Sequence, residues 1–418
     1  MTPFRPLVWA AALASVVSPL HAAAAEIRSL TLERAVELAL ERNPTLRAQA
    51  LSITSAEANE VTATFRPTPV FSNEAQDFTA AVTQLFERGG KRQRRIESAK
   101  LSTNIVTTDF SDARRSLLFA VRKAFTDALL AKSNLALAQE NLKSFQEVED
   151  LNRIRFEKGD ISGADFLKIE LQKLQFQNDV QDANLALKTA RTTLMTLLAT
   201  AEIAEDFDIE GELKFAEFDM TLADLKAIAL RDRPDLRSAE ALRKKTEADI
   251  RLAIANSYTD ISLTLGYHHT EPNLPTWLSP GVSKGPTENS VGFGFSFPLR
   301  IFDRNQGEIA RTKAEAIRAV SIAEAVRNQI SSDVEVSYAA FRTSRERVRL
   351  YEQVYLGRAK ESREIAEFAY KSGATSILDL LEAERTYRGV QLAYRQALAT
   401  YRTNLYQLNS AVGTDVAK

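Results

Sequence analysis

The longest regular pattern in the chain lies between Gly307 and Ser372, a stretch with no proline and one internal glycine, Gly357. Apolar and small residues return there at alternating steps of four and three residues. The stripe consists of Ile330, Val334, Ser337, Phe341, Ser344, Val348, Tyr351 and Tyr355. A spacing of about 3.5 residues is the repeat of a left-handed coiled coil. It predicts a helix over 307–371 that is roughly 95 Å long. No compact core needs such a helix, so we expect the protein to span a distance.

A second stripe with the same spacing occurs earlier and predicts a long helix over 91–158. Its members are Leu117, Val121, Ala124, Ala128, Ala131, Leu135, Ala138, Leu142 and Phe145. Each long segment ends at a turn that contains glycine, and a proline-free stretch follows it, over 164–200 and over 377–412. The second of these keeps heptad register through Tyr387, Tyr394, Leu398, Tyr401, Leu405, Leu408 and Val412. We expect both stretches to be helices that return antiparallel to the long ones.

The two helical hairpins belong to two copies of one unit, since the residues that open the first copy recur at a constant offset of 190 positions. The matched residues are Thr31, Leu32, Ala39, Leu40, Pro44, Leu46, Arg47, Glu57 and Ala58, and their counterparts are Thr221, Leu222, Ala229, Leu230, Pro234, Leu236, Arg237, Glu247 and Ala248. This register indicates a tandem duplication. The expected domains are a first repeat over 26–201, an irregular acidic linker over 202–219, a second repeat over 220–413 and a tail over 414–418.

Between the short and the long helices of each copy the apolar period changes to two residues, which is typical of strands. The alternating apolar residues of the second copy are Ile261, Leu263, Leu265, Tyr267, Val291, Phe293, Phe295 and Phe297. They predict a hairpin over 259–298 with a long loop over 270–289. The counterpart over 66–86 alternates less regularly. A hairpin in a soluble sheet has the same pattern, but the coiled coils and the signal peptide described below favour a membrane hairpin.

Four strands per chain are too few to close a membrane barrel. Such barrels begin at about eight strands, because a smaller one has no interior and leaves an open edge in lipid. The protomer is therefore expected to oligomerise. Three copies would supply twelve strands, although the count alone leaves a dimer and a trimer open.

The first 25 residues resemble a secretory signal peptide, with Arg5, an apolar run over 7–17 and small residues over 22–25. A buried N-terminal helix is the alternative. No later run of about 18 apolar residues predicts a transmembrane helix. The absence of cysteine and the presence of only three histidines exclude thiolate and His-rich metal sites.

The charge of the chain is balanced, with 54 Lys and Arg residues against 55 Asp and Glu residues. The basic cluster of Arg88, Lys91, Arg92, Arg94 and Arg95 would suit nucleic acid. A neutral chain with a signal peptide argues against that partner. The sequence has no P-loop, nucleophile elbow or zinc-protease motif, which favours a protein that is not an enzyme and needs no cofactor.

With this organisation the chain resembles the TolC-type outer membrane factors of tripartite efflux and type I secretion systems, from Thr31 to about Gly413. Two motifs at the strand-to-helix transitions resemble the CzcC-like heavy-metal efflux branch of that family. They are Phe86-Glu87-Arg88-Gly89-Gly90-Lys91-Arg92 and Phe302-Asp303-Arg304-Asn305-Gln306-Gly307. The resemblance implies a mainly α fold with a small membrane β-barrel. Long antiparallel coiled-coil helices would form a periplasmic α-barrel, and four strands per protomer would give a twelve-stranded barrel in a homotrimer.

The resemblance also implies an outer membrane location, extending into the periplasm, and a passive export duct. The implied partners are outer membrane lipid, a periplasmic adaptor protein and an inner membrane transporter of the RND type. The branch implies heavy-metal cations as cargo, although the chain has no cluster that would select a metal. The alternatives are a drug efflux or type I secretion duct within the family, and a secreted coiled-coil structural or adhesion protein without a pore.

The candidate site residues lie at two levels of the chain. By resemblance, Asp165, Asp379 and Glu382 fall on the acidic positions of the periplasmic gate. The tips at Gly159 and Gly373 are expected to dock the adaptor. The strand-to-helix transitions contain Gly89, Gly90, Asp303, Arg304, Asn305 and Gly307, and in both of them glycine is expected where the strand turns into the helix.

The spacing of the gate residues gives separate support, because Asp379 and Glu382 are three residues apart and share a helix face. In a trimer they would form carboxylate rings that attract cations and raise one another's pKa. The alternative is that the acidic residues cap or solvate the first turn of the return helix. Thr375 stands where well-known members have an arginine that ties the entrance shut, so the closing network is expected to differ.

Overall fold

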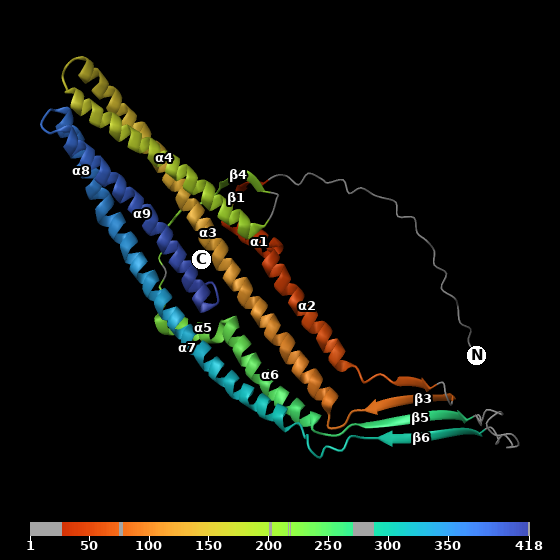
Figure 1. Ribbon diagram of the computed structural model, residues 1–418. Helices are drawn as coiled ribbons and strands as arrows, with labels where there is room; N and C mark the ends of the chain where they lie inside the picture. The colour runs from red at the N-terminus through yellow and green to blue at the C-terminus, as the bar shows by residue number, and fades with distance from the viewer. Residues whose placement is uncertain are drawn as a thin grey trace, which may run out of the picture.

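The computed structural model describes residues 27–74, 78–199, 203–215, 217, 219–270 and 288–416. The expected signal peptide and nearly all of the 270–289 loop lie outside these residues. Figure 1 shows an elongated molecule in which long helices run from a β-sheet at one end to two helical hairpin tips at the other. The mainly helical fold expected from the sequence is confirmed.

Each repeat contributes two short helices and one long hairpin. In the first these are α1 (Leu32–Arg42), α2 (Pro44–Thr64), α3 (Lys91–Glu157) and α4 (Gly163–Leu198), and in the second α5 (Leu222–Asp232), α6 (Pro234–Asn256), α7 (Gln306–Leu350), α8 (Leu356–Lys371) and α9 (Ile377–Val412). The repeated residues place these elements. Thr31 and Thr221 accept a hydrogen bond from the backbone of the first turn of α1 and α5, and Pro44 and Pro234 begin α2 and α6.

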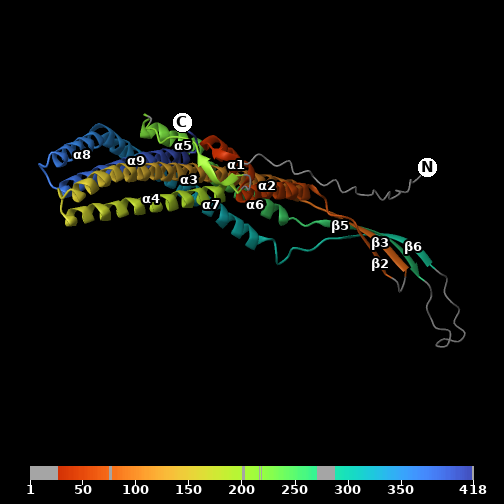
Figure 2. The same cartoon turned by 90° about the horizontal axis from the view of Figure 1, so that it is seen from above.

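Helix α3 lies at the centre of the layer of helices. Toward the tips the neighbours follow the order α4, α3, α9 and α8, and toward the sheet the order α2, α3, α6 and α7. Figure 2 shows the sheet continuing beyond the helical ends as a twisted extension. Three buried clusters stabilise the layer, around Val121 and Leu194, around Phe341 and Tyr401, and around Phe145 and Ile377 near the tips.

The predicted seam of the second long helix is buried as far as Val348. Ile330, Val334, Phe341 and Val348 are almost fully buried, but Tyr355 is 45% exposed, so its assignment to the seam is wrong. The reason is a π-helical turn over Tyr351–Tyr355 that separates α7 from α8. A π-turn inserts one residue into the helical repeat.

Beyond the π-turn, the buried positions are shifted by one residue toward the C-terminus relative to the predicted heptad pattern. Ala359 and Tyr370 are buried, whereas unbroken steps of four and three would have placed Arg358 and Ala369 on the seam. Tyr394 of α9 donates from its hydroxyl to Glu352 in the turn, at 2.8 Å. The turn therefore sets the rotation of all of α8.

The segment expected to be an irregular linker contains a strand, β4 (Ile203–Ile209). It pairs in parallel with β1 (Ile27–Leu30) at the start of the described chain. Phe207 and Ile209 are buried in the same cluster as Leu30 and Val121. Acidic residues interrupt the apolar alternation of this segment, so its sequence pattern does not predict a strand. Its pairing partner, β1, lies more than 170 positions away in the sequence.

The strands of both repeats form one antiparallel sheet in the order β2 (Val70–Glu74), β3 (Phe78–Phe86), β5 (Ile261–Thr270) and β6 (Glu288–Ser296). The two predicted hairpins are therefore joined edge to edge through β3 and β5, with Val82 opposite Leu265. None of the helices in the described part of the chain is both long enough and apolar enough to cross a membrane.

Deleting Gln353, an exposed residue of the π-turn, should convert α7 and α8 into one continuous α-helix. Tyr370 would then leave the seam, where it now donates a hydrogen bond to the buried Asn152. We expect Tyr370→Phe to cost about 1–3 kcal/mol of stability in the wild type, because it leaves a buried acceptor unsatisfied. In the deletion variant the same substitution should cost almost nothing.

The measurement is thermal unfolding of the detergent-extracted protein, followed by circular dichroism. Gln353→Ala is the control, since it changes the same side chain without shortening the turn. An equal cost of Tyr370→Phe in the deletion and control backgrounds would show that the π-turn does not set this register.

Candidate functional site

The two hairpin tips close in the same way. Gly159 and Gly373 both adopt left-handed conformations, with φ of 82° and 74°. The next residue of each tip donates its backbone N–H to a carbonyl in the last helical turn, from Asp160 to Arg155 and from Ala374 to Ala369, both at 2.8 Å. This is the glycine-dependent helix end known as the Schellman motif. An added Cβ at either glycine would meet no other atom within 4 Å, so both tips are open to a partner.

Ser162 is the N-cap of α4, and the carboxylate of Asp165 accepts a hydrogen bond from this capping residue. Ser162 accepts a hydrogen bond from the Asp165 backbone at 3.1 Å and donates its hydroxyl to the Asp165 carboxylate at 2.8 Å. Lys168 lies 2.9 Å from the same carboxylate. The contact with Lys168, followed by that with Ser162, lowers the pKa of Asp165 below its ordinary value.

Asp379 occupies the equivalent position of the second tip. It forms a capping box with Ser376, whose backbone N–H donates to the Asp379 carboxylate at 3.1 Å. The hydroxyl of Thr375 donates to the same oxygen. These contacts, that of Thr375 first, lower the pKa of Asp379. Thr375 therefore supports the cap of α9.

Glu382 lies one turn further along α9 and is exposed, with Arg385 at 3.2 Å. The carboxylate of Asp379 thus caps α9, that of Asp165 accepts a hydrogen bond from the capping residue of α4, and Glu382 makes neither contact. All three carboxylates lie in the first turns of the return helices at the tip end of the molecule (Figure 1).

A buried polar group connects the two hairpins just below the tips, and the sequence analysis did not identify it. Asn152 of α3 is fully buried and accepts a hydrogen bond from the hydroxyl of Tyr370 on α8. Burial opposes ionisation of the nearby Glu149, but Lys173 at 2.6 Å and Arg153 at 2.7 Å keep its pKa lowered. The burial of these two polar residues could have been predicted from the sequence, because Glu149 and Asn152 continue the heptad steps of four and three residues beyond Phe145.

At the first strand-to-helix transition, Gly89 and Gly90 both have positive φ, of 70° and 72°. An added Cβ at Gly89 would lie 2.6 Å from the ring of Tyr258, whereas one at Gly90 would meet nothing within 4 Å. Gly89 is therefore required for close packing as well as for its backbone angle.

The second transition uses asparagine where the sequence analysis expected glycine. Asn305 has a φ of 63°, and its side chain donates to the carbonyl of Ala253 at 2.8 Å. Asp303 accepts from the backbone of Asn305 at 2.8 Å, and the backbone of Arg304 donates to Gln306 at 2.7 Å. Gly307 lies inside α7 without a positive φ, so its expected role in the turn is wrong.

The basic cluster of the first transition holds the two repeats together. Lys91 is only 6% exposed and pairs with Asp260 of the second repeat at 2.6 Å. Arg92 and Arg95 donate to the last carbonyls of α2, and Arg95 also pairs with Glu87 at 2.7 Å. Cationic side chains stabilise the negative end of a helix dipole.

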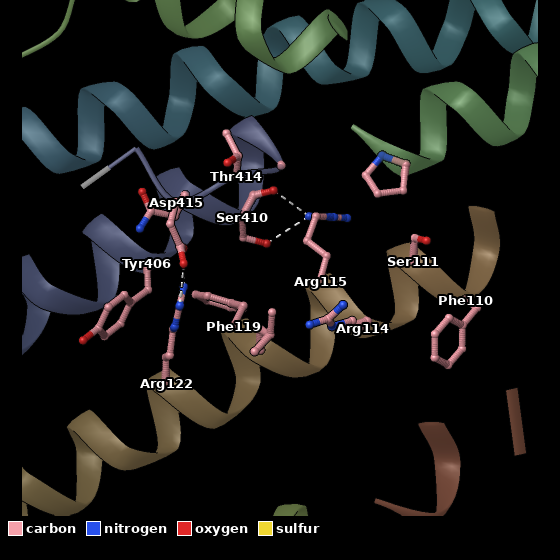
Figure 3. A pocket seen from close by; sticks show the side chains of 14 residues that line it. Phe110, Ser111, Arg114, Arg115, Phe119, Arg122, Tyr406, Ser410, Thr414 and Asp415 are labelled. Carbon is pink, nitrogen blue, oxygen red and sulfur yellow. Dashed lines mark hydrogen bonds and ion pairs between the residues drawn. The ribbon is translucent and has the colours of Figure 1, made fainter. Parts of the chain in front are cut away.

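A cavity of about 270 Å³ lies beside the C-terminal end of α9 and is shown in Figure 3. Arg115 of α3 donates to the carbonyl and the hydroxyl of Ser410, at 2.7 and 2.9 Å. Arg122 donates both terminal nitrogens to Asp415. Arg115 and Arg122 are therefore already paired, and they fasten the C-terminal end of α9 to α3 across this cavity.

The model of the family described as "Outer membrane efflux protein" matches residues 35–200 and 226–414, which is most of the chain. The chain belongs to this outer membrane efflux protein family. The TolC-type resemblance read from the sequence is thereby confirmed. Its channels are passive ducts rather than enzymes, and they lie in the outer membrane and extend into the periplasm.

Two relatives and one solved structure place this efflux protein within the family. It is 25% identical to the cobalt-zinc-cadmium resistance protein CzcC of Cupriavidus metallidurans, over 89% of this chain and 88% of CzcC. It is also 25% identical to nodulation protein T of Rhizobium leguminosarum bv. trifolii, over 78% and 69%. A membrane protein from Pseudomonas aeruginosa has the same fold, with a TM-score of 0.78, 20% identity and 98% of both chains covered.

Gly89→Ala should destabilise this efflux protein more than Gly90→Ala. Both substitutions place a side chain at positive φ, at a cost of about 1–2 kcal/mol. Only Gly89→Ala also forces the ring of Tyr258 to move, which adds about 1–3 kcal/mol. Thermal unfolding in detergent measures the difference. Equal losses in the two variants would mean that Tyr258 moves aside freely.

Proposed function

We propose that three copies of the chain assemble into an export duct whose three sheets close into one twelve-stranded barrel in the outer membrane. The main support for this proposal is the sheet of the single protomer, which has one apolar face, one largely polar face and two unpaired edges. Its four strands have two edges, β2 and β6, that pair with no further strand of the described chain. Unpaired edges are not tolerated in lipid, and three such sheets joined edge to edge would leave none.

The register separates an apolar face from a polar face. Directly opposed residues in an antiparallel sheet lie on the same face, and one such row is Phe71, Val82, Leu265 and Phe293. The neighbouring row on the other face is Val70, Thr83, Thr264 and Gly294, which is polar or small apart from Val70 on β2, and the two threonines are 2.9 Å apart. Phe293 is 90% exposed in the protomer. An apolar outside and a polar inside are typical of a membrane barrel.

The helices at the two edges of the layer also expose apolar stripes. On α4 these are Leu167, Leu171, Leu174 and Leu185, and on α8 and the start of α9 they are Ile365, Phe368 and Leu378. The edge of one protomer can therefore pack against the opposite edge of the next. Such a head-to-tail contact closes into a ring. In the proposed trimer, each of the repeats over 26–201 and 220–413 would contribute its long helix and its return helix to the wall of the tunnel.

We infer that the cargo is heavy-metal cations, delivered by an inner membrane transporter of the RND type through a periplasmic adaptor. The similarity to CzcC over nearly the whole of both chains supports this cargo. The open tips at Gly159 and Gly373 are the proposed adaptor-docking surfaces, because exposed helical hairpins offer coiled-coil surface. The carboxylates of Asp165, Asp379 and Glu382 would form the cation-attracting entrance, while that of Asp379 also caps α9.

The duct can be tested by two substitutions at the same depth of the sheet. Phe293→Asp places a charge on the apolar face, which is unfavourable in lipid, and should abolish heat-resistant trimers in outer membrane extracts. Gly294→Asp places the same charge on the polar face, where an added side chain meets nothing within 4 Å, and trimers should persist. In a host supplied with the cognate transporter and adaptor, only the trimer-forming variants should restore cobalt, zinc and cadmium tolerance.

The outcomes separate the parts of the proposal. Trimers that restore tolerance to organic compounds but not to metals would overturn the cargo and retain the duct, as the similarity to nodulation protein T would allow. A soluble monomer exported from the cell would overturn the duct in favour of a secreted coiled-coil protein.

The gate is tested by single-channel conductance in the presence of divalent cations. Asp379→Asn/Glu382→Gln should abolish cation block, whereas Glu361→Gln/Glu364→Gln, which removes two exposed charges from α8, should leave it unchanged. The capping contacts lower the pKa of Asp379. Repulsion between the carboxylates of the ring would raise it, so block that persists as pH falls past the ordinary aspartate pKa of about 3.9 would show that the capping contacts dominate. Block that survives the first double substitution would leave these residues with a capping role only.

A further inference from the structure

The segments that join helices to strands are basic, although the chain as a whole is nearly neutral. We define the junction collar as residues 65–69, 87–95, 257–260 and 297–305. It contains eight Lys and Arg residues and three Asp and Glu residues, a net charge of +5, whereas the whole chain has a net charge of −1. In the proposed trimer the collar would surround the barrel at the level where the long helices begin.

Some of these cations are already used within the protein, and others are not. Lys91, Arg94 and Arg95 form ion pairs, and Arg92 donates to a helix carbonyl. In the part of the chain that the structure describes, Arg66, Arg88, Arg300 and Arg304 have no acidic side chain within ion-pair distance. The Nε of Arg300 is buried and has no hydrogen-bond acceptor.

Two of the unpaired arginines, Arg66 and Arg300, directly follow exposed apolar residues in the chain, Phe65 and Leu299. The apolar alternation of β6 continues beyond the end of the strand through Phe297, Leu299 and Ile301, all of them exposed. Phe297 stacks on Phe295 with 6.2 Å between ring centroids, and a turn at Ile301 leaves Phe302 91% exposed. Arginines set between exposed apolar residues suit a boundary between hydrocarbon and charged headgroups.

We propose that the junction collar binds the phosphate headgroups of anionic phospholipids in the periplasmic leaflet, with Phe297–Phe302 inserted at the level of the acyl chains. This inference rests on the proposed function, because it needs the sheet to lie in the bilayer. The apolar surface of the collar continues the face that contains Phe293, which is the proposed lipid face. A neighbouring protomer would pair with the backbone edge of β6 and would not cover that face.

The test places a single tryptophan in the collar. The two native tryptophans, Trp9 and Trp277, are changed to phenylalanine, and Phe302→Trp supplies the reporter. The full-length protein is reconstituted into vesicles of equal parts phosphatidylglycerol and phosphatidylcholine, with one lipid or the other brominated to quench the fluorescence. We expect the collar to prefer phosphatidylglycerol by at least about fivefold, since one arginine near an anionic surface contributes about that factor. The preference should fall at high salt.

Arg300→Gln/Arg304→Gln should abolish the preference. Arg342→Gln/Arg347→Gln, which removes two exposed arginines from α7, is the matched control and should leave the preference unchanged. Equal quenching by the two lipids, or a preference that survives Arg300→Gln/Arg304→Gln, would overturn headgroup binding. The absence of quenching by either lipid in assembled trimers would show that protein covers Phe302. The absence of heat-resistant trimers from the vesicles would instead overturn the proposed function together with this inference.

Discussion

The packing of α3 along its neighbours is the interaction on which the rest of the structure depends. This 67-residue helix contacts α4 and α9 toward the tips and α2 and α6 toward the sheet. Both hairpins and both pairs of short helices therefore take their positions from one element. Small seam residues such as Ala124, Ala128 and Ala131 let neighbouring helices approach closely, so α3 joins the two repeats into a single layer rather than two separate domains.

A second requirement acts where the helical layer becomes a sheet. Helices pack about 8–10 Å apart and strands about 4.8 Å apart, so each chain segment must turn sharply at the same level. Gly89, Gly90 and Asn305 supply the left-handed turns, and the Lys91–Asp260 pair ties the first transition to the start of β5. Because β3 and β5 pair directly, an error in one transition would shift the register of strands from both repeats.

Sequence periodicity was sufficient for the elements whose pattern is long and locally repeated. The helices over 91–157 and 377–412 and the strands around Leu265 and Phe293 lie where the apolar spacing placed them. The periodicity did not predict local structure that depends on a single inserted residue or on a strand far away in the sequence. The π-turn at Tyr351–Tyr355 adds one residue without a turn signal, β4 depends on β1, and Asn305 replaces the expected glycine. The carboxylates proposed for the gate were chosen from the sequence, but the hydrogen bonds that Asp165 and Asp379 make depend on tip geometry.

The dual position of Asp165 and Asp379 limits how this entrance can change during evolution. Each carboxylate belongs to the hydrogen-bonded start of its return helix as well as to the charged surface of the tip. A substitution at either position that removes the carboxylate oxygens, such as alanine, would change the charge of the proposed entrance and also weaken the helix start, whereas asparagine would remove the charge and keep an acceptor. Glu382, which makes no capping contact, is free of this linkage, so selection on cargo charge can act at Glu382 without loss of tip stability.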